Sequence, residues 1–116
     1  MKKAILSALA VLCMSSTVYA GDQDFTLKNK TGHEIKEVYV SKPSAKSWGH
    51  DILGDGVLSN NGSKLVRFKP TTSACEWELQ VVFNDDSSVE WPAFDLCSIH
   101  TITLHYENGE ATAEEN

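Results

Sequence analysis

The segment from Cys75 to Phe83 carries the pattern that most restricts how this chain can fold. Large apolar side chains occupy every second position, at Trp77, Leu79 and Val81, with polar residues between most of them. Successive side chains of a β-strand point to opposite faces, so this alternation predicts a strand with one buried face. A helix needs apolar residues three and four apart, and no credible run with that period follows residue 20.

Shorter alternating runs occur elsewhere in the chain, separated by turn-forming residues. They begin near Phe25, Ile35, Lys64, Val89 and Ile99. Several short alternating strands without helices are typical of sandwiches and barrels. We therefore predict an all-β fold, a small antiparallel β-sandwich of about six to seven strands with one disulfide. A small open barrel is the alternative.

Two local features interrupt the alternation. Ile35 is an odd number of residues from Val38, so we expect one extra residue, a β-bulge, near Lys36 and Glu37. Pro92 cannot donate a hydrogen bond to a β-ladder, so it must end its strand or lie at the edge of a sheet.

The first 20 residues have the form of an export signal. Two lysines precede an apolar stretch from Ala4 to Met14, and Val18 and Ala20 occupy the −3 and −1 positions of a small-residue cleavage site. The apolar stretch is shorter than the roughly 20 residues that span a membrane. We predict a signal peptide over residues 1–20, a periplasmic or secreted location, and no membrane insertion in the mature form.

Two cysteines, Cys75 and Cys97, remain after the predicted signal. Two cysteines in an exported protein permit one intramolecular bridge. We predict a structural disulfide rather than a redox-active pair, which usually has the closer spacing C-x-x-C. Cys13 suggests a lipid-anchored alternative, but Leu12 stands where that signal normally needs a small residue.

The charge of the chain excludes some classes of partner. It has 16 acidic and 10 basic residues, and loss of the two signal lysines would leave a formal net charge of −8. An acidic surface argues against non-specific binding to nucleic acid or to anionic lipid. We assign one domain to residues 21–106. Residues 107–116 hold four acids and no large apolar residue, so we predict an acidic mobile tail.

The stretch around residues 48–56 is the most unusual in the sequence. We take it as the candidate ligand or partner loop, with Trp48, Gly49, His50, Asp51 and Asp55 as its candidate residues. The two aspartates could supply oxygens to calcium, and His50 with Asp51 could join a copper or zinc site that a distant residue completes. The interpretation we favour is structural: Trp48 plugs one end of the sandwich while the glycines turn the chain.

Aromatic side chains outside the core are candidate contacts with sugars or with protein partners. An indole combines a large apolar face with one hydrogen-bond donor, which suits it to such contacts. Trp48 and Trp91 are the two candidates, and Trp91 is the candidate aromatic contact outside the loop. Trp77 alternates with core residues, so we expect it to be buried.

The sequence lacks the residue patterns of the common catalytic sites. It contains no G-x-S-x-G, no Cys-His nucleophile pair and no phosphate-binding glycine loop. Glu76 and Glu78 share a strand face, but nothing near them suggests the apolar pocket that glycoside hydrolysis needs. His100 and His105 are five residues apart on one strand, so they point to opposite faces. We predict that the protein is not an enzyme and has no cofactor.

The segments NKTG, VYVS, WGHDILG, a strand that begins with cysteine, and EWPAFDLC occur in this order along the chain. This order resembles a family of small exported bacterial proteins of unestablished function, over about residues 25 to 104. The resemblance implies a compact β-sandwich and adds little about activity. It marks as signature positions Trp48, Gly49, Asp51, Leu53 and Gly54.

These observations favour a non-enzymatic exported binding module that acts through protein contact. The negative charge would steer such a module toward a basic partner. An inhibitor or an immunity-type partner of a cationic exported enzyme is one concrete form of this hypothesis. The alternative is a module that binds a divalent metal or a glycan through the Trp48–Asp55 loop.

Overall fold

A computed structural model describes residues 23–69 and 72–116, so the predicted signal peptide lies outside the described residues. Over these ranges the chain forms seven strands and no helix, which confirms the predicted fold class. No helix in these ranges is long and apolar enough to cross a membrane. The strands are β2 (Phe25–Lys30), β3 (Ile35–Ser41), β4 (Ser63–Val66), β5 (Glu76–Phe83), β6 (Ser88–Asp95), β7 (Thr101–Glu107) and β8 (Glu110–Glu115).

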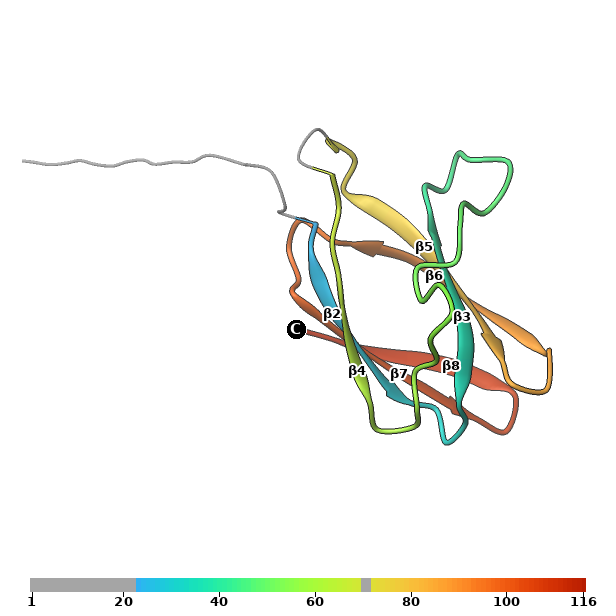
Figure 1. The fold of residues 1–116 in the computed structure, drawn as a ribbon. Helices are drawn as coiled ribbons and strands as arrows, with labels where there is room; N and C mark the ends of the chain where they lie inside the picture. The colour runs from blue at the N-terminus through green and yellow to red at the C-terminus, as the bar shows by residue number, and fades with distance from the viewer. Residues whose placement is uncertain (1–22, 70–71) are drawn as a thin grey trace, which may run out of the picture.

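The strands form two sheets, shown in Figure 1. One has the order β4-β2-β7-β8 and the other the order β3-β5-β6. Four of the five strand pairs are antiparallel, as the sequence predicts. The exception is β2 with β7, which run parallel with Leu27 opposite Ile102 and Asn29 opposite Leu104. The first and last parts of the domain thus lie side by side in one sheet.

The inward faces of both sheets form one apolar core. In β5, Leu79, Val81 and Phe83 are buried, as their alternation predicts. Trp77 is half-buried, and its ring centroid lies 4.9 Å from that of Phe68. The alternation predicts a buried Trp77, and in the structure its side chain packs against the rim of the core and is partly buried. The other buried core residues are Phe25, Leu27, Ile35, Val38, Leu58, Val66, Trp91, Phe94, Leu96, Ile102 and Leu104.

Both predicted interruptions of the alternation are confirmed. The register of β3 with β5 shifts between Ile35 and Glu37, which places the bulge at Lys36. Pro92 lies in β6, the edge strand of its sheet, and the register of β5 with β6 shifts between Leu79–Trp91 and Trp77–Phe94. A proline without an N–H group is tolerated there because an edge strand pairs on one side only.

Residues 107–116 do not form the predicted mobile tail. Residues Glu110–Glu115 are strand β8, which pairs with β7 over its whole length. A two-residue turn joins the strands, and both of its residues have positive φ, 54° for Asn108 and 79° for Gly109. Asn-Gly is the pair that a type I′ hairpin turn favours. The small side chains of Ala111 and Ala113 face inward in β8 and are half-buried against the core.

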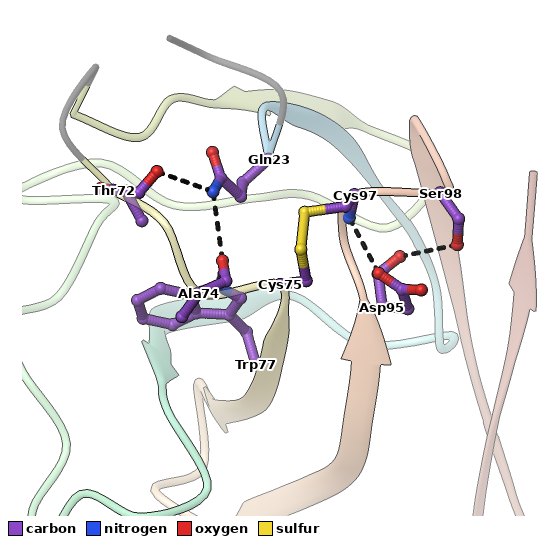
Figure 2. Close-up of a disulfide and its surroundings, with 8 residues drawn as sticks. All are labelled: Gln23, Thr72, Ala74, Cys75, Trp77, Asp95, Cys97 and Ser98. Atoms are coloured by element: carbon purple, nitrogen blue, oxygen red, sulfur yellow. Dashed lines mark hydrogen bonds between the residues drawn. A yellow bond between two sulfur atoms is a disulfide. The ribbon is translucent and has the colours of Figure 1, made fainter. Parts of the chain in front are cut away.

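The predicted disulfide joins Cys75 to Cys97 (Figure 2). Cys75 immediately precedes β5, and Cys97 lies in the turn between β6 and β7. The backbone amide of Leu96 donates a hydrogen bond of 2.8 Å to the carbonyl oxygen of Cys75, beside the bridge. The side-chain amide of Gln23 donates to the carbonyl oxygens of Thr72 and Ala74 at the same end of the molecule.

Candidate functional site

The candidate loop is held against the edge of β3 through Asp51. One carboxylate oxygen of Asp51 accepts hydrogen bonds from the backbone amides of Val38, at 2.9 Å, and Leu53, at 3.0 Å. The amide of Ile52 donates to the carbonyl oxygen of Val38, also at 2.9 Å. Gly54 follows with a φ of +61°, a conformation that glycine adopts without the strain of a Cβ atom. Asp51 therefore braces the loop.

The remaining candidate residues of the loop do not form a ligand set with Asp51. Trp48 is half-buried, whereas Gly49, His50 and Asp55 are exposed. Across residues 23–69 and 72–116, one group of three or more His, Cys, Asp or Glu side chains lies close enough to hold a metal ion: Cys75, Asp95 and Cys97. Its two sulfur atoms are bonded to each other, so it offers no thiolate ligand. A metal or glycan ligand of the loop stays a prediction from the sequence.

Replacing Asp51 by alanine is expected to destabilise the protein by about 1–3 kcal/mol, since it leaves the buried amide of Val38 without its acceptor. Replacement by asparagine keeps an acceptor oxygen and should cost less. Urea denaturation followed by circular dichroism measures both changes. Equal stability of Asp51→Ala and the parent protein would contradict the bracing role.

Trp91 is not available as an aromatic contact in this structure. Its side chain is 2 % exposed, and its indole N–H donates a 2.8 Å hydrogen bond to the carbonyl oxygen of Thr112 in β8. Alternation places Trp91 on the inner face of β6, opposite Leu79 of β5. The prediction of a contact residue is wrong, because Trp91 lies on the inner face of a strand and not outside the core.

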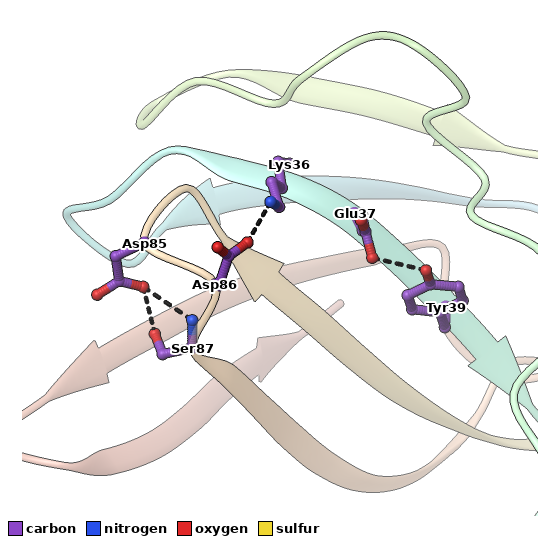
Figure 3. Close-up of polar contacts among 6 residues, drawn as sticks. All are labelled: Lys36, Glu37, Tyr39, Asp85, Asp86 and Ser87. Atoms are coloured by element: carbon purple, nitrogen blue, oxygen red, sulfur yellow. Dashed lines mark hydrogen bonds and ion pairs between the residues drawn. The ribbon is translucent and has the colours of Figure 1, made fainter.

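Several polar side chains near the β5–β6 turn form hydrogen bonds or an ion pair with neighbouring side chains (Figure 3). The Tyr39 hydroxyl donates to Glu37 at 2.6 Å, and this hydrogen bond raises the pKa of Tyr39 to about 12. Asp86 pairs with Lys36 and raises the pKa of that lysine. Hydrogen bonds from the side chain and then the backbone of Ser87 lower the pKa of Asp85. These contacts fix the turn and the bulge.

A groove lies between the two sheets where β3 and β4 are their respective edges. Two adjoining hollows of about 350 and 280 Å³ share His50, Ile52, Val66 and Arg67 among their lining residues. We call this continuous surface the β3–β4 groove. Its apolar lining comprises Val40, Ile52, Leu65, Val66, Phe68 and Trp77, and its cationic or titratable lining comprises His50, Lys64, Arg67 and Lys69.

The groove combines features that binding surfaces for other molecules share. Leu65 is 47 % exposed beside it, and Lys64, Arg67 and Lys69 are exposed as well. Among the described residues, no carboxylate lies within 4.0 Å of the side-chain nitrogens of these three cations. An apolar floor with a few charged groups at its rim is the usual composition of a binding site. The groove is the candidate functional site of the described chain.

Acidic side chains gather on a different surface. The outer face of the β3-β5-β6 sheet carries Glu37 opposite Val82, Glu78 opposite Ser41 and Glu90 opposite Gln80. The negative net charge of the chain is therefore the sum of a basic surface at the groove and an acidic surface on the outer face of the β3-β5-β6 sheet. The acids of this outer face and the cations of the groove lie on different surfaces.

Sequence reasoning found one residue of the groove, His50, and missed the others. The alternation over Lys64–Phe68 predicts the strand, but it does not predict that this strand lies at the edge of its sheet. A cluster of basic residues in an acidic chain is the signal that was available: Lys64, Arg67 and Lys69 lie within six residues of one another.

The described residues form a disulfide-bonded β-sandwich with the β3–β4 groove between the edges of its two sheets. No known protein family, curated protein or solved structure matches this chain. The likeness to small exported bacterial proteins therefore stays a prediction from the sequence segments that carry it.

Proposed function

We propose that this protein is a non-enzymatic binding module of the periplasm or the extracellular medium, and that it acts through protein contact at the β3–β4 groove. The observation that carries the proposal is the uncovered edge of β4 beside an apolar groove. The disulfide is compatible with an oxidising compartment outside the cytoplasm, where such bonds persist.

The other three sheet edges have features that protect them from pairing. β6 contains Pro92 and a bulge, and β8 carries Glu110, Glu114 and Glu115. The edge of β3 is covered by Asp51 and Ile52 and by an isolated bridge from Ile35 to Leu58. Proline, bulges, charges and covering loops are the usual protection of exposed edges. Within the described residues, the protection of the β4 edge is its length of four residues and its side-chain charges, so a partner of suitable charge can reach this edge.

Capture of a partner by the immobilised mature protein tests the proposal, with Leu65→Ser as the groove variant and Val57→Ser as its matched control. Both residues are exposed, at 47 % and 53 %, but Val57 does not line the groove. Partners are taken from periplasmic extract and from culture medium at low and high ionic strength. Loss of one well-packed contact residue costs about 1–2 kcal/mol, so Leu65→Ser should weaken binding about tenfold and Val57→Ser should leave it unchanged.

Two outcomes would contradict the proposal. A partner that binds both variants equally well would place the contact elsewhere on the molecule. No captured protein from either source, at either ionic strength, would contradict protein contact as the function.

A further inference from the structure

The free edge of β4 can accept one more strand. In the order β4-β2-β7-β8, β4 has β2 as its single strand neighbour, so one row of its backbone N–H and C=O groups has no strand partner in the described chain. An extended peptide that pairs with this row satisfies those groups and continues the sheet. Such a peptide would run along the β3–β4 groove, since residues 64–67 form one wall of it.

The register of β4 determines which side chains the added strand would meet. Lys64 and Val66 pair with the buried residues Leu27 and Phe25, so they lie on the inner side, toward the groove. Leu65, between them, lies on the outer side of β4, and Arg67 follows the last residue of the strand; both also line the groove. From residue 64 to residue 67, the edge therefore presents a cation, two apolar side chains and a second cation.

We infer that the β3–β4 groove binds an extended acidic segment of a partner protein, with the pattern acid–apolar–apolar–acid, as a fifth strand beside β4. Directly opposite side chains in paired strands lie on the same face and interact, so acids would face Lys64 and Arg67, and apolar residues would face Leu65 and Val66. The pattern reads the same in both directions, so it fits a parallel or an antiparallel partner. This inference rests on the proposed function and names its partner class.

The charges also disfavour a second copy of the chain as the occupant. Two β4 edges would bring Lys64 and Arg67 of each copy together, and like charges opposite one another destabilise a strand pair. The acidic strand β8, with the sequence EATAEE, never places two apolar residues between two acids. A segment from another protein is therefore the occupant that fits.

The test uses acetylated and amidated six-residue peptides added to the 15N-labelled full mature protein. TEVVET carries the predicted pattern, TKVVKT reverses its charge, and VETTEV keeps its composition in another order. We expect TEVVET to shift the amide resonances of residues 50–52 and 63–67, with an affinity about tenfold higher than that of TKVVKT, as expected for two ion pairs at a partly exposed site. VETTEV keeps both acids but places threonines opposite Leu65 and Val66, so it should bind more weakly than TEVVET through the loss of apolar contact. Adjacent N–H groups of a strand point to opposite sides, so methylation of both valine amides must block one edge hydrogen bond and weaken binding.

A charge-swap variant keeps the test decisive. The variant Lys64→Glu with Arg67→Glu should lose TEVVET and gain TKVVKT, a gain that a misfolded protein would not show. The matched control is Lys28→Glu with Lys30→Glu, which changes the net charge equally on β2, at exposed residues that do not line the groove. This control should bind TEVVET nearly as well as the parent.

Each remaining outcome contradicts the inference in a different way. Equal affinity for TEVVET and TKVVKT would contradict selection of the partner by charge. Full affinity of the methylated peptide would contradict binding by strand addition. Concentration-dependent dimerisation that Leu65→Ser abolishes would identify a second copy as the occupant. If TEVVET does not bind but Leu65→Ser still loses the captured partner, the inference fails and the proposed function stands.

Discussion

Replacing Trp91 by alanine is expected to destabilise the folded protein by about 3–5 kcal/mol, the usual cost of removing a large buried aromatic side chain. Trp91 is among the largest fully buried side chains, and it contacts both sheets. Its ring lies on the inner face of β6, while its N–H group donates to Thr112 of β8 in the other sheet. Removal leaves a cavity and also breaks this hydrogen bond between the sheets.

Chemical denaturation followed by far-ultraviolet circular dichroism measures the Trp91 effect. Trp91→Phe is the control, because it keeps most of the apolar volume and removes the N–H donor, so it should cost clearly less than alanine. If Trp91 were an exposed contact residue, its replacement by alanine would leave the stability of the fold nearly unchanged. An alanine variant within about 0.5 kcal/mol of the parent, as is usual for a surface substitution, would contradict the core role.

Removal of the Cys75–Cys97 bridge is expected to cost about 3 kcal/mol, from the loop that it closes in the unfolded chain. The two cysteines are 22 residues apart in sequence, and the bridge ties the start of β5 to the turn after β6. Without it, the unfolded chain gains conformations while the folded state keeps its strand pairs. The expected result is a lower denaturation midpoint and an unchanged fold.

Single and double serine variants at Cys75 and Cys97 give the measurement. All three should have the same stability as the reduced parent protein, and a reducing agent should have no further effect on the double variant. If the variants denature at the midpoint of the oxidised parent, the bridge contributes nothing to stability.

Structural features that depend only on neighbouring residues, such as a bulge or a tight turn, leave a local pattern in the sequence. The odd spacing between Ile35 and Val38 required an extra residue, and the bulge lies there. The Asn108-Gly109 pair was an equally strong local signal for a hairpin. The four acids and the lack of a large apolar residue in 107–116 indicated a tail instead, although β8 needs only two small inward side chains to lie against β7.

Features that depend on distant parts of the chain could not be predicted in the same way. The parallel pairing of β2 with β7 depends on how the two sheets are connected, since alternation specifies faces and not neighbours. The groove depends on which strand is left at the edge of a sheet. Its basic lining was hidden in the net charge, which sums Lys64 and Arg67 with glutamates on the opposite side of the sandwich.

The parallel pair also has a consequence for the order in which this protein can fold. Phe25–Lys30 is synthesised before the other described strands, yet its partner in the centre of the sheet is Thr101–Glu107. The β4-β2-β7-β8 sheet therefore cannot be completed until nearly the whole chain is present, and long-range closure of this kind slows folding. Until then the early strands keep their apolar faces and edges exposed to other chains. A nascent chain of this topology therefore cannot complete its larger sheet before Thr101–Glu107 has been synthesised.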